Sequence, residues 1–200
     1  HWDLADNTAG IGFTGDELDM NTNFANGFSI YMTAYNNGIQ WGNDNLWGIG
    51  GGTGGNPPNG IIATIYETGV AMYYTGGGQH SLPTASLPQG ETHNLLFTID
   101  SNNESKIYKN GTLVSSTTYT KSVSYLGDGN NTSFPIGVHA QALVTGHHLT
   151  YKWPGSITNI KIWNSAVDWD TAHNYDPNAS APALTNASIK YGNSINLQMK

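Results

Sequence analysis

Two carboxylates on one expected strand are the residues of this chain whose spacing could do chemistry. Glu17 and Asp19 alternate with the apolar Leu18 and Met20, so the pattern predicts a strand with both acids on one face. Residues i and i+2 of a strand lie roughly 6.5–7 Å apart, near enough for two carboxylates to act on one glycosidic bond. The plainer interpretation is the polar outward face of a half-buried strand.

An oxygen-rich segment, residues 128–132, could hold calcium. It reads Asp-Gly-Asn-Asn-Thr, and its candidate ligands are Asp128 and Asn130. Calcium takes about six to eight oxygen ligands, which include backbone carbonyls. The segment follows no ordered calcium motif, so an Asx-rich turn is the alternative and calcium is a candidate cofactor only.

Aromatic residues are the strongest indication of function. The chain has 6 Trp and 11 Tyr, more than the core of a β-sandwich normally needs. Exposed rings stack on the apolar faces of sugars, while neighbouring amides read the hydroxyl groups; core packing is the alternative. Several rings fall in or near expected loops, and we predict that the ligand contacts come from Trp41, Trp47, Tyr73, Tyr74 and Trp153. Trp163 lies within an expected strand and is assigned to the core.

The composition excludes several classes of partner. Charged residues make up 10% of the chain, the formal net charge is −7, and every basic residue is a lysine. Nucleic acid is excluded because phosphate recognition needs a basic face, and an anionic membrane surface would be repelled. No apolar run approaches the ~20 residues of a membrane span, so we expect no membrane insertion. A surface this poor in charge suits an extracellular, cell-surface or virion-surface location.

Turn residues divide the chain into short strands. The 25 Gly and 8 Pro separate segments rich in β-branched and aromatic residues, a pattern typical of an all-β sandwich or barrel. Residues 43–60 are expected to form a long loop and residues 168–175 one helical turn. The clearest expected strands and hairpin arms are residues 12–20, 24–35, 61–66, 70–75, 93–100, 106–114, 134–139, 157–163 and 187–199.

Two local details can be predicted within these strands. Asn110-Gly111 is the dipeptide of a type I′ hairpin turn. Ile160 and Ile162 share one strand face, whereas Ile157 has the opposite parity. Either both faces are buried there or a bulge near Thr158 and Asn159 resets the register, and we favour the bulge.

One segment also carries a family resemblance. Residues 153–168, Trp-Pro-Gly-Ser-Ile-Thr-Asn-Ile-Lys-Ile-Trp-Asn-Ser-Ala-Val-Asp, resemble a signature near the end of laminin-G-like, concanavalin A-like domains. Further segments resemble that family in the same order, from about Trp2 to Asp170: residues 13–20, 26–31, 93–100, 106–114 and 136–137. The resemblance implies a jelly-roll-like antiparallel two-sheet sandwich with little helix, one concave sheet and functional rim loops. We expect a single domain over residues 1–200, with a closing strand or tail at 176–200.

The same fold class includes laminarinase-type glycoside hydrolases, which carry a Glu-x-Asp-x-x-Glu run. Here Glu17 and Asp19 match its start, but Asn21 and Thr22 stand where its second glutamate belongs, so we assign no catalytic residue. We therefore expect a non-catalytic lectin-like module that binds glycans or a glycoprotein surface, or mediates adhesion. The alternatives are a structural subunit of a homo- or hetero-assembly, such as a virion fibre or adhesin domain, and a polysaccharide-degrading enzyme.

Overall fold

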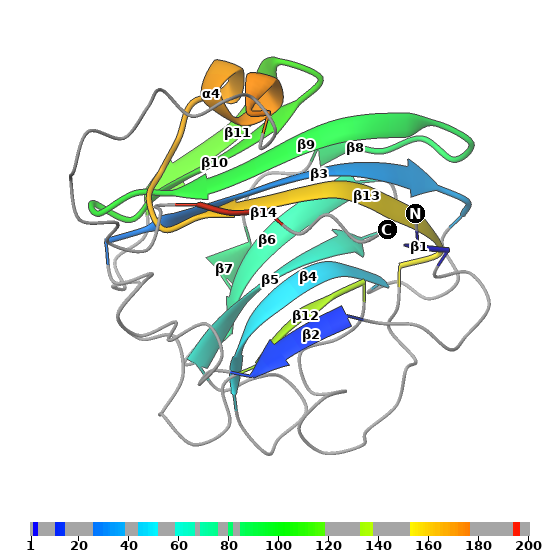
Figure 1. Cartoon of the computed structure of the whole chain (residues 1–200). Coiled ribbons are helices and arrows are strands. Elements are labelled where there is room, and N and C mark those ends of the chain that lie inside the picture. The colour runs from blue at the N-terminus through cyan, green and yellow to red at the C-terminus, as the bar shows by residue number, and fades with distance from the viewer. Residues whose placement is uncertain are drawn as a thin grey trace.

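Two antiparallel β-sheets stacked face to face, with one short helix, make up the described part of the protein, as the computed structural model shows (Figure 1). The structure describes residues 2–3, 11–14, 26–38, 44–51, 59–66, 69–75, 80–81, 85–118, 133–137, 153–176 and 194–196. Every pairing between the described strands is antiparallel. The predicted all-β sandwich is therefore confirmed.

The first sheet, here sheet A, has the strand order β1-β13-β3-β9-β10-β11, with β14 also beside β13. Its strands are β1 (Trp2–Asp3), β3 (Phe28–Asn36), β9 (Thr92–Ile99), β10 (Glu104–Lys109), β11 (Thr112–Thr118), β13 (Gly155–Trp163) and β14 (Ser194–Asn196). The pairing of β14 with β13 brings a part of the expected closing segment into this sheet.

The second sheet, sheet B, has the order β2-β12-β4-β5-β6-β7, and β8 also pairs with β6. Its strands are β2 (Ile11–Thr14), β4 (Asp44–Gly51), β5 (Asn59–Tyr66), β6 (Gly69–Thr75), β7 (His80–Ser81), β8 (Ala85–Ser86) and β12 (Ser133–Ile136). The predicted pair of strands at residues 61–66 and 70–75 is confirmed as β5 and β6.

The core lies between the two sheets and follows the alternation of strand residues. In β3, Phe28, Ile30 and Met32 are fully buried and face inward, as predicted. They pack with inward residues of β9, β10 and β13 and with Leu46, Trp47, Ile61 and Ala63 of sheet B. Successive residues of a strand point to opposite faces, so this alternation orients both sheets.

The predicted bulge in β13 is confirmed. Thr158 pairs with Thr33 and Lys161 with Tyr31, so β13 has one residue more than β3 between these pairs. Asn159 takes up the extra residue in a left-handed conformation, with φ 52°, which asparagine tolerates better than most residues. Because the bulge resets the register, Ile157 and Ile160 both reach the core.

The Asn110-Gly111 turn is confirmed as well. Both residues have positive φ, 49° and 89°, which a type I′ turn requires. The flanking strands pair from Lys109 and Thr112 onward. The predicted helical turn is the short helix α4 (Trp169–Asn174), which Asp168 caps by accepting a hydrogen bond of 2.7 Å from the backbone N–H of Thr171. Hydrogen bonding from the Thr171 side chain, and next from its backbone N–H, lowers the pKa of Asp168.

The loop predicted over residues 43–60 is wrong, because β4 and the start of β5 occupy much of it. Gly48, Gly50 and Gly51 give β4 the composition of a loop, since glycine is depleted in strands. Pairing with β5 on one side and β12 on the other holds β4 in sheet B. Tertiary pairing here overrides weak local preference.

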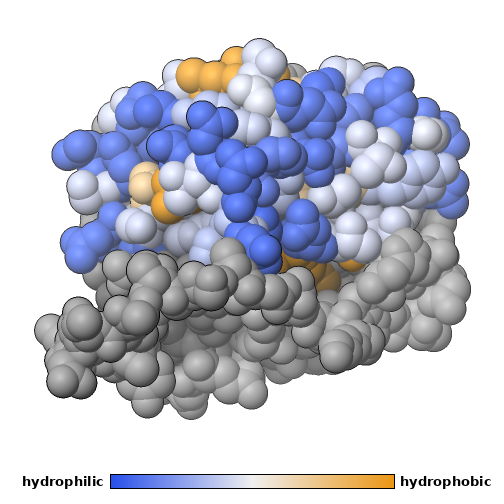
Figure 2. Space-filling view, turned by 45° about the horizontal axis from the view of Figure 1, so that its top comes forward, coloured by the Kyte–Doolittle hydropathy of each residue, from blue (hydrophilic) through white to orange (hydrophobic). Residues whose placement is uncertain are grey.

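The described surface is mostly polar. Figure 2, which turns the α4 side toward the viewer, shows a largely hydrophilic surface with small, separate hydrophobic areas. Among the described residues, the large hydrophobic side chains that are exposed are Leu113 and Val114 of β11, at 47% and 36%. No described helix has the length and apolar character needed to cross a membrane.

Candidate functional site

Two of the predicted contact residues lie in the core. Trp47 and Trp153 are both 0% exposed. The ring of Trp47 makes edge contacts with Phe28 and Phe97, at centroid distances of 5.9 and 5.5 Å. The Trp153 Nε1–H donates a 2.9 Å hydrogen bond to the carbonyl oxygen of Tyr35. The prediction that these two rings contact a ligand is wrong, because both are buried in the core, Trp47 from β4 and Trp153 from just before β13.

For the other predicted site residues, the structure gives either the strand position alone or no position. Tyr73 and Tyr74 belong to β6, where they pair with Ile62 and Ile61 of β5. Trp41, Asp128 and Asn130 lie outside the described residues, as do Glu17 and Asp19. Within the described part of the chain, no three His, Asp or Glu side chains gather where they could hold a metal ion.

The outer face of sheet A is partly covered by α4. A second apolar cluster forms there, made of Tyr31, Leu96, Trp163 and Ala172, and Figure 1 places α4 on this side, near β10 and β11. The assignment of Trp163 to buried packing is confirmed at 5% exposure, although its cluster lies outside the sheet rather than between the sheets. The helix therefore closes part of this sheet face.

A buried lysine joins α4 to sheet A. Lys161 of β13 is 4% exposed, and its Nζ donates to the carbonyl oxygens of Ala172 and His173, at 2.9 and 3.3 Å. The ammonium lies 4.9 Å from the ring centroid of Tyr31, a favourable cation–π distance. Burial lowers the pKa of Lys161, and the Asp176 carboxylate opposes that shift. The lysine satisfies carbonyls at the end of the helix, where a cation is favoured.

The outer face of sheet B carries polar side chains instead. Asn45 and Thr64 are partners across β4 and β5, and Thr64 has the opposite parity to Ile61 and Ala63, which face the core. Both polar residues are buried, at 1% and 2% exposure. At this burial the two side chains do not themselves meet a ligand, but they show that this side of sheet B is polar where the outer side of sheet A is apolar. Sheet B is therefore the candidate functional face.

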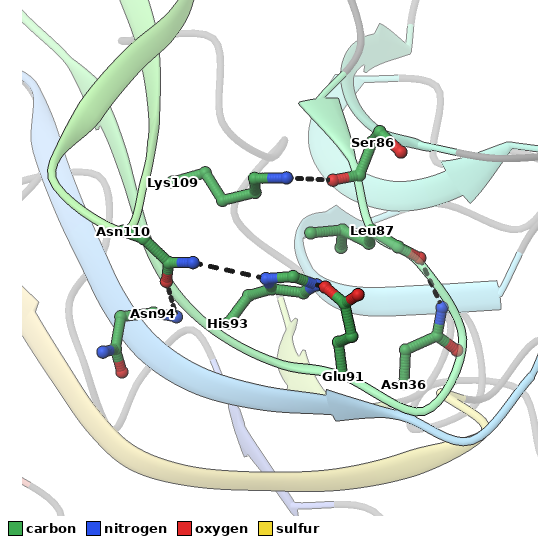
Figure 3. Close-up of polar contacts among 8 residues, drawn as sticks. All are labelled: Asn36, Ser86, Leu87, Glu91, His93, Asn94, Lys109 and Asn110. Carbon is green, nitrogen blue, oxygen red and sulfur yellow. Dashed lines mark hydrogen bonds and ion pairs between the residues drawn. The ribbon is translucent and has the colours of Figure 1, made fainter.

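A further polar cluster surrounds His93 at the start of β9 (Figure 3). Sequence reasoning missed this cluster, because its members come together only when β8, β9 and β10 assemble. His93 is 3% exposed; its Nδ1 lies 3.4 Å from Nδ2 of Asn110, and its Nε2 lies 3.5 Å from the Glu91 carboxylate. The last distance is suitable for an ion pair with a protonated ring but is long for a hydrogen bond.

The neighbouring contacts indicate a structural brace. Lys109 Nζ donates to the Ser86 carbonyl oxygen at 2.7 Å, and Asn36 Nδ2 donates to that of Leu87 at 2.7 Å. These bonds join the connection between β8 and β9 to β10 and β3. A His–Glu pair could transfer protons, but this ring is buried and held on one side by Asn110, so bracing explains the geometry better.

The brace makes folding stability dependent on pH. Burial and the Lys109 charge lower the pKa of His93, while Glu91 opposes them. The folded state then binds fewer protons than the unfolded state as the pH falls through about 6.5, so stability is full above that value and decreases below it. We expect the midpoint of thermal unfolding to fall between pH 7.5 and 5.5, less steeply in His93→Gln and more steeply in Glu91→Gln. An unchanged slope in His93→Gln would show that another group is responsible.

Comparisons with known proteins place this fold. The sequence model of the concanavalin A-like lectin/glucanases superfamily matches residues 61–172. No curated protein matches the chain in sequence.

Several solved structures share the sandwich. A CBM40 of the Ruminococcus gnavus IT-sialidase, bound to α2,3 sialyllactose, is 17% identical with a TM-score of 0.59, over 82% of this chain and 90% of that one. Domain 4 of AbnA, a GH43 extracellular arabinanase from Geobacillus stearothermophilus in complex with arabinotriose, is 18% identical with a TM-score of 0.56, over 74% of this chain and 65% of that one. The NanB sialidase of Streptococcus pneumoniae is 16% identical with a TM-score of 0.64, over 86% of this chain.

Two of these matches cover only part of the other chain. The chain spans 27% of the NanB chain and 65% of the AbnA domain. At such identities the likeness shows the fold alone. The family match covers more than half of the 200 residues and agrees with the observed sheets, so the chain belongs to the concanavalin A-like lectin/glucanases superfamily.

Proposed function

We propose that this protein is a non-catalytic, lectin-like domain that binds glycans. The observation that carries the proposal is the shared sandwich with a sialidase CBM40 bound to sialyllactose, over 90% of that chain. The AbnA domain in complex with arabinotriose supports it independently. We also propose an extracellular or surface location, in line with the extracellular enzyme that carries the AbnA domain.

We propose the outer face of sheet B as the binding face. Part of sheet A is covered by α4, whereas Asn45 and Thr64 give sheet B polar groups on its outer side. With Trp47 and Trp153 buried, the remaining aromatic candidates belong to sheet B or adjoin it: Tyr73 and Tyr74 are in β6, and Trp41 precedes β4 in the sequence. Tyr74 pairs with Ile61, which faces the core, so Trp41 and Tyr73 are the rings that we expect to stack on sugar faces.

We propose a structural role for calcium and no direct contact with the glycan. Its ligands would be Asp128 and Asn130. Its test is to measure glycan retention with added calcium and after chelation by EGTA. Equal retention in both conditions would remove calcium from the proposed mechanism.

The main experiment measures retention of the purified chain on a panel of immobilised oligosaccharides. We expect saturable binding to at least one, and at least about tenfold weaker binding in Trp41→Ala or Tyr73→Ala, since aromatic anchors carry a large part of binding energy. Leu113→Ala is the matched control, because it removes an exposed apolar side chain from β11 of sheet A. Release of reducing ends that Glu17→Gln abolishes would favour the hydrolase instead.

A further inference from the structure

We propose that the glycans recognised by this domain are neutral, and that sugars bearing a carboxylate are disfavoured. This inference rests on the proposed glycan-binding function and names the chemical class of its ligand. It follows from the charge of the chain and from the contacts of its lysines.

The domain carries a strong excess of negative charge. The formal net charge is −7, and the chain contains lysine but no arginine. Among the residues whose side chains are described, six carboxylates stand against three lysines. The six are Glu91, Asp100, Glu104, Asp168, Asp170 and Asp176. A field of one sign repels a ligand of the same sign and slows its approach.

The described lysines are already engaged within the protein. Lys161 is buried beneath α4, where its ammonium is bonded to two carbonyl oxygens. Lys106 pairs with Glu104 at 2.8 Å, and this contact is the main reason why its pKa is raised. Lys109 donates to the Ser86 carbonyl oxygen at 2.7 Å.

All three belong to strands of sheet A, whereas the proposed binding face is on sheet B, so none of them is placed to meet a ligand carboxylate there. Four further lysines lie outside the described residues: Lys121, Lys152, Lys190 and Lys200. The experiment must test whether one of them pairs with a ligand carboxylate. A carboxylate that leaves water and finds no cationic partner loses hydration energy that the protein does not replace. A sugar hydroxyl avoids this cost, because protein amides and hydroxyls can replace its hydrogen bonds to water. The domain should therefore bind a neutral sugar more tightly than the same sugar with a carboxylate.

The experiment compares matched pairs of sugars by isothermal titration of the whole chain. Lactose and α2,3-sialyllactose form one pair, and oligomers of galactose and of galacturonic acid form another. Where the neutral member binds, we expect its acidic counterpart to bind at least about tenfold more weakly. The difference should shrink between 20 and 300 mM salt, because ions screen repulsion between exposed charges.

The outcomes separate this inference from the proposed function. Acidic sugars that bind as tightly as neutral ones, or more tightly, would overturn the inference while glycan binding stands. Single Lys→Gln replacements at positions 121, 152, 190 and 200 would then identify the cation. If no member of either pair and no other oligosaccharide in the panel binds, the proposed function fails and the inference fails with it. Lys106→Gln should leave neutral binding unchanged.

Discussion

Trp47→Ala is expected to lower the free energy of unfolding by about 3–5 kcal/mol, the usual cost of removing a large aromatic ring from a core. Trp47 lies between the two sheets and contacts Phe28 of β3 and Phe97 of β9. Because Trp47 belongs to sheet B and both of these rings to sheet A, its removal leaves a space between the sheets that neither sheet can easily fill. The measurement is urea unfolding followed by circular dichroism.

Two further variants make this result specific. Leu113→Ala, at an exposed position, should change stability by no more than about 0.5 kcal/mol. Trp47→Phe should lose much less than Trp47→Ala, since the indole N–H that it removes has no hydrogen-bond partner among the described residues and an unsatisfied buried donor is costly. If Trp47→Ala were as stable as the parent but lost glycan binding, the ring would be a ligand contact after all.

Lys161→Ala is expected to lower the free energy of unfolding by about 2–3 kcal/mol, in the range for hydrogen bonds to a charged group. It would leave the carbonyls of Ala172 and His173 without their donor. A helix of six residues is too short to persist without tertiary contacts, so α4 should loosen first. Hydrogen exchange of the α4 amides, together with urea unfolding, measures both effects.

Lys161→Met serves as the matched control for this prediction. It keeps an unbranched apolar stem against Tyr31 but removes the charge and its donors. Faster exchange in α4 in both variants would assign the effect to the hydrogen bonds, whereas faster exchange in the alanine variant alone would assign it to packing. Normal α4 exchange and parental stability in Lys161→Ala would contradict the role given to the ammonium.

Much of the fold could be predicted because its signals are local. The Asn110-Gly111 turn, the helical turn within residues 168–175 and the bulge near Thr158 and Asn159 each depend on the conformational preferences of a few adjacent residues. The order of the family-like segments then fixed the sandwich. The strand β4 escaped prediction because its glycines carry no local preference, and only its neighbours in sheet B define it.

The candidate site was less predictable for a different reason. Burial of Trp47 depends on strand register, and burial of Trp153 depends on contact with residues far away in the sequence such as Tyr35. Neighbouring residues in the sequence reveal neither. The cluster around His93 depends on three strands meeting. One available signal was overlooked: Tyr31 and Leu96 occupy outward positions of β3 and β9 but are large and apolar, which indicates that something packs on that face.

The most direct test of glycan recognition by sheet B is an amide chemical-shift titration of the whole chain with the neutral oligosaccharide that binds best. We expect shifts that saturate and concentrate in β4, β5 and β6, with little change in α4, β10 and β11. Shifts confined to α4 and β11, or no shift with any oligosaccharide at millimolar concentration, would contradict the proposed binding face and function.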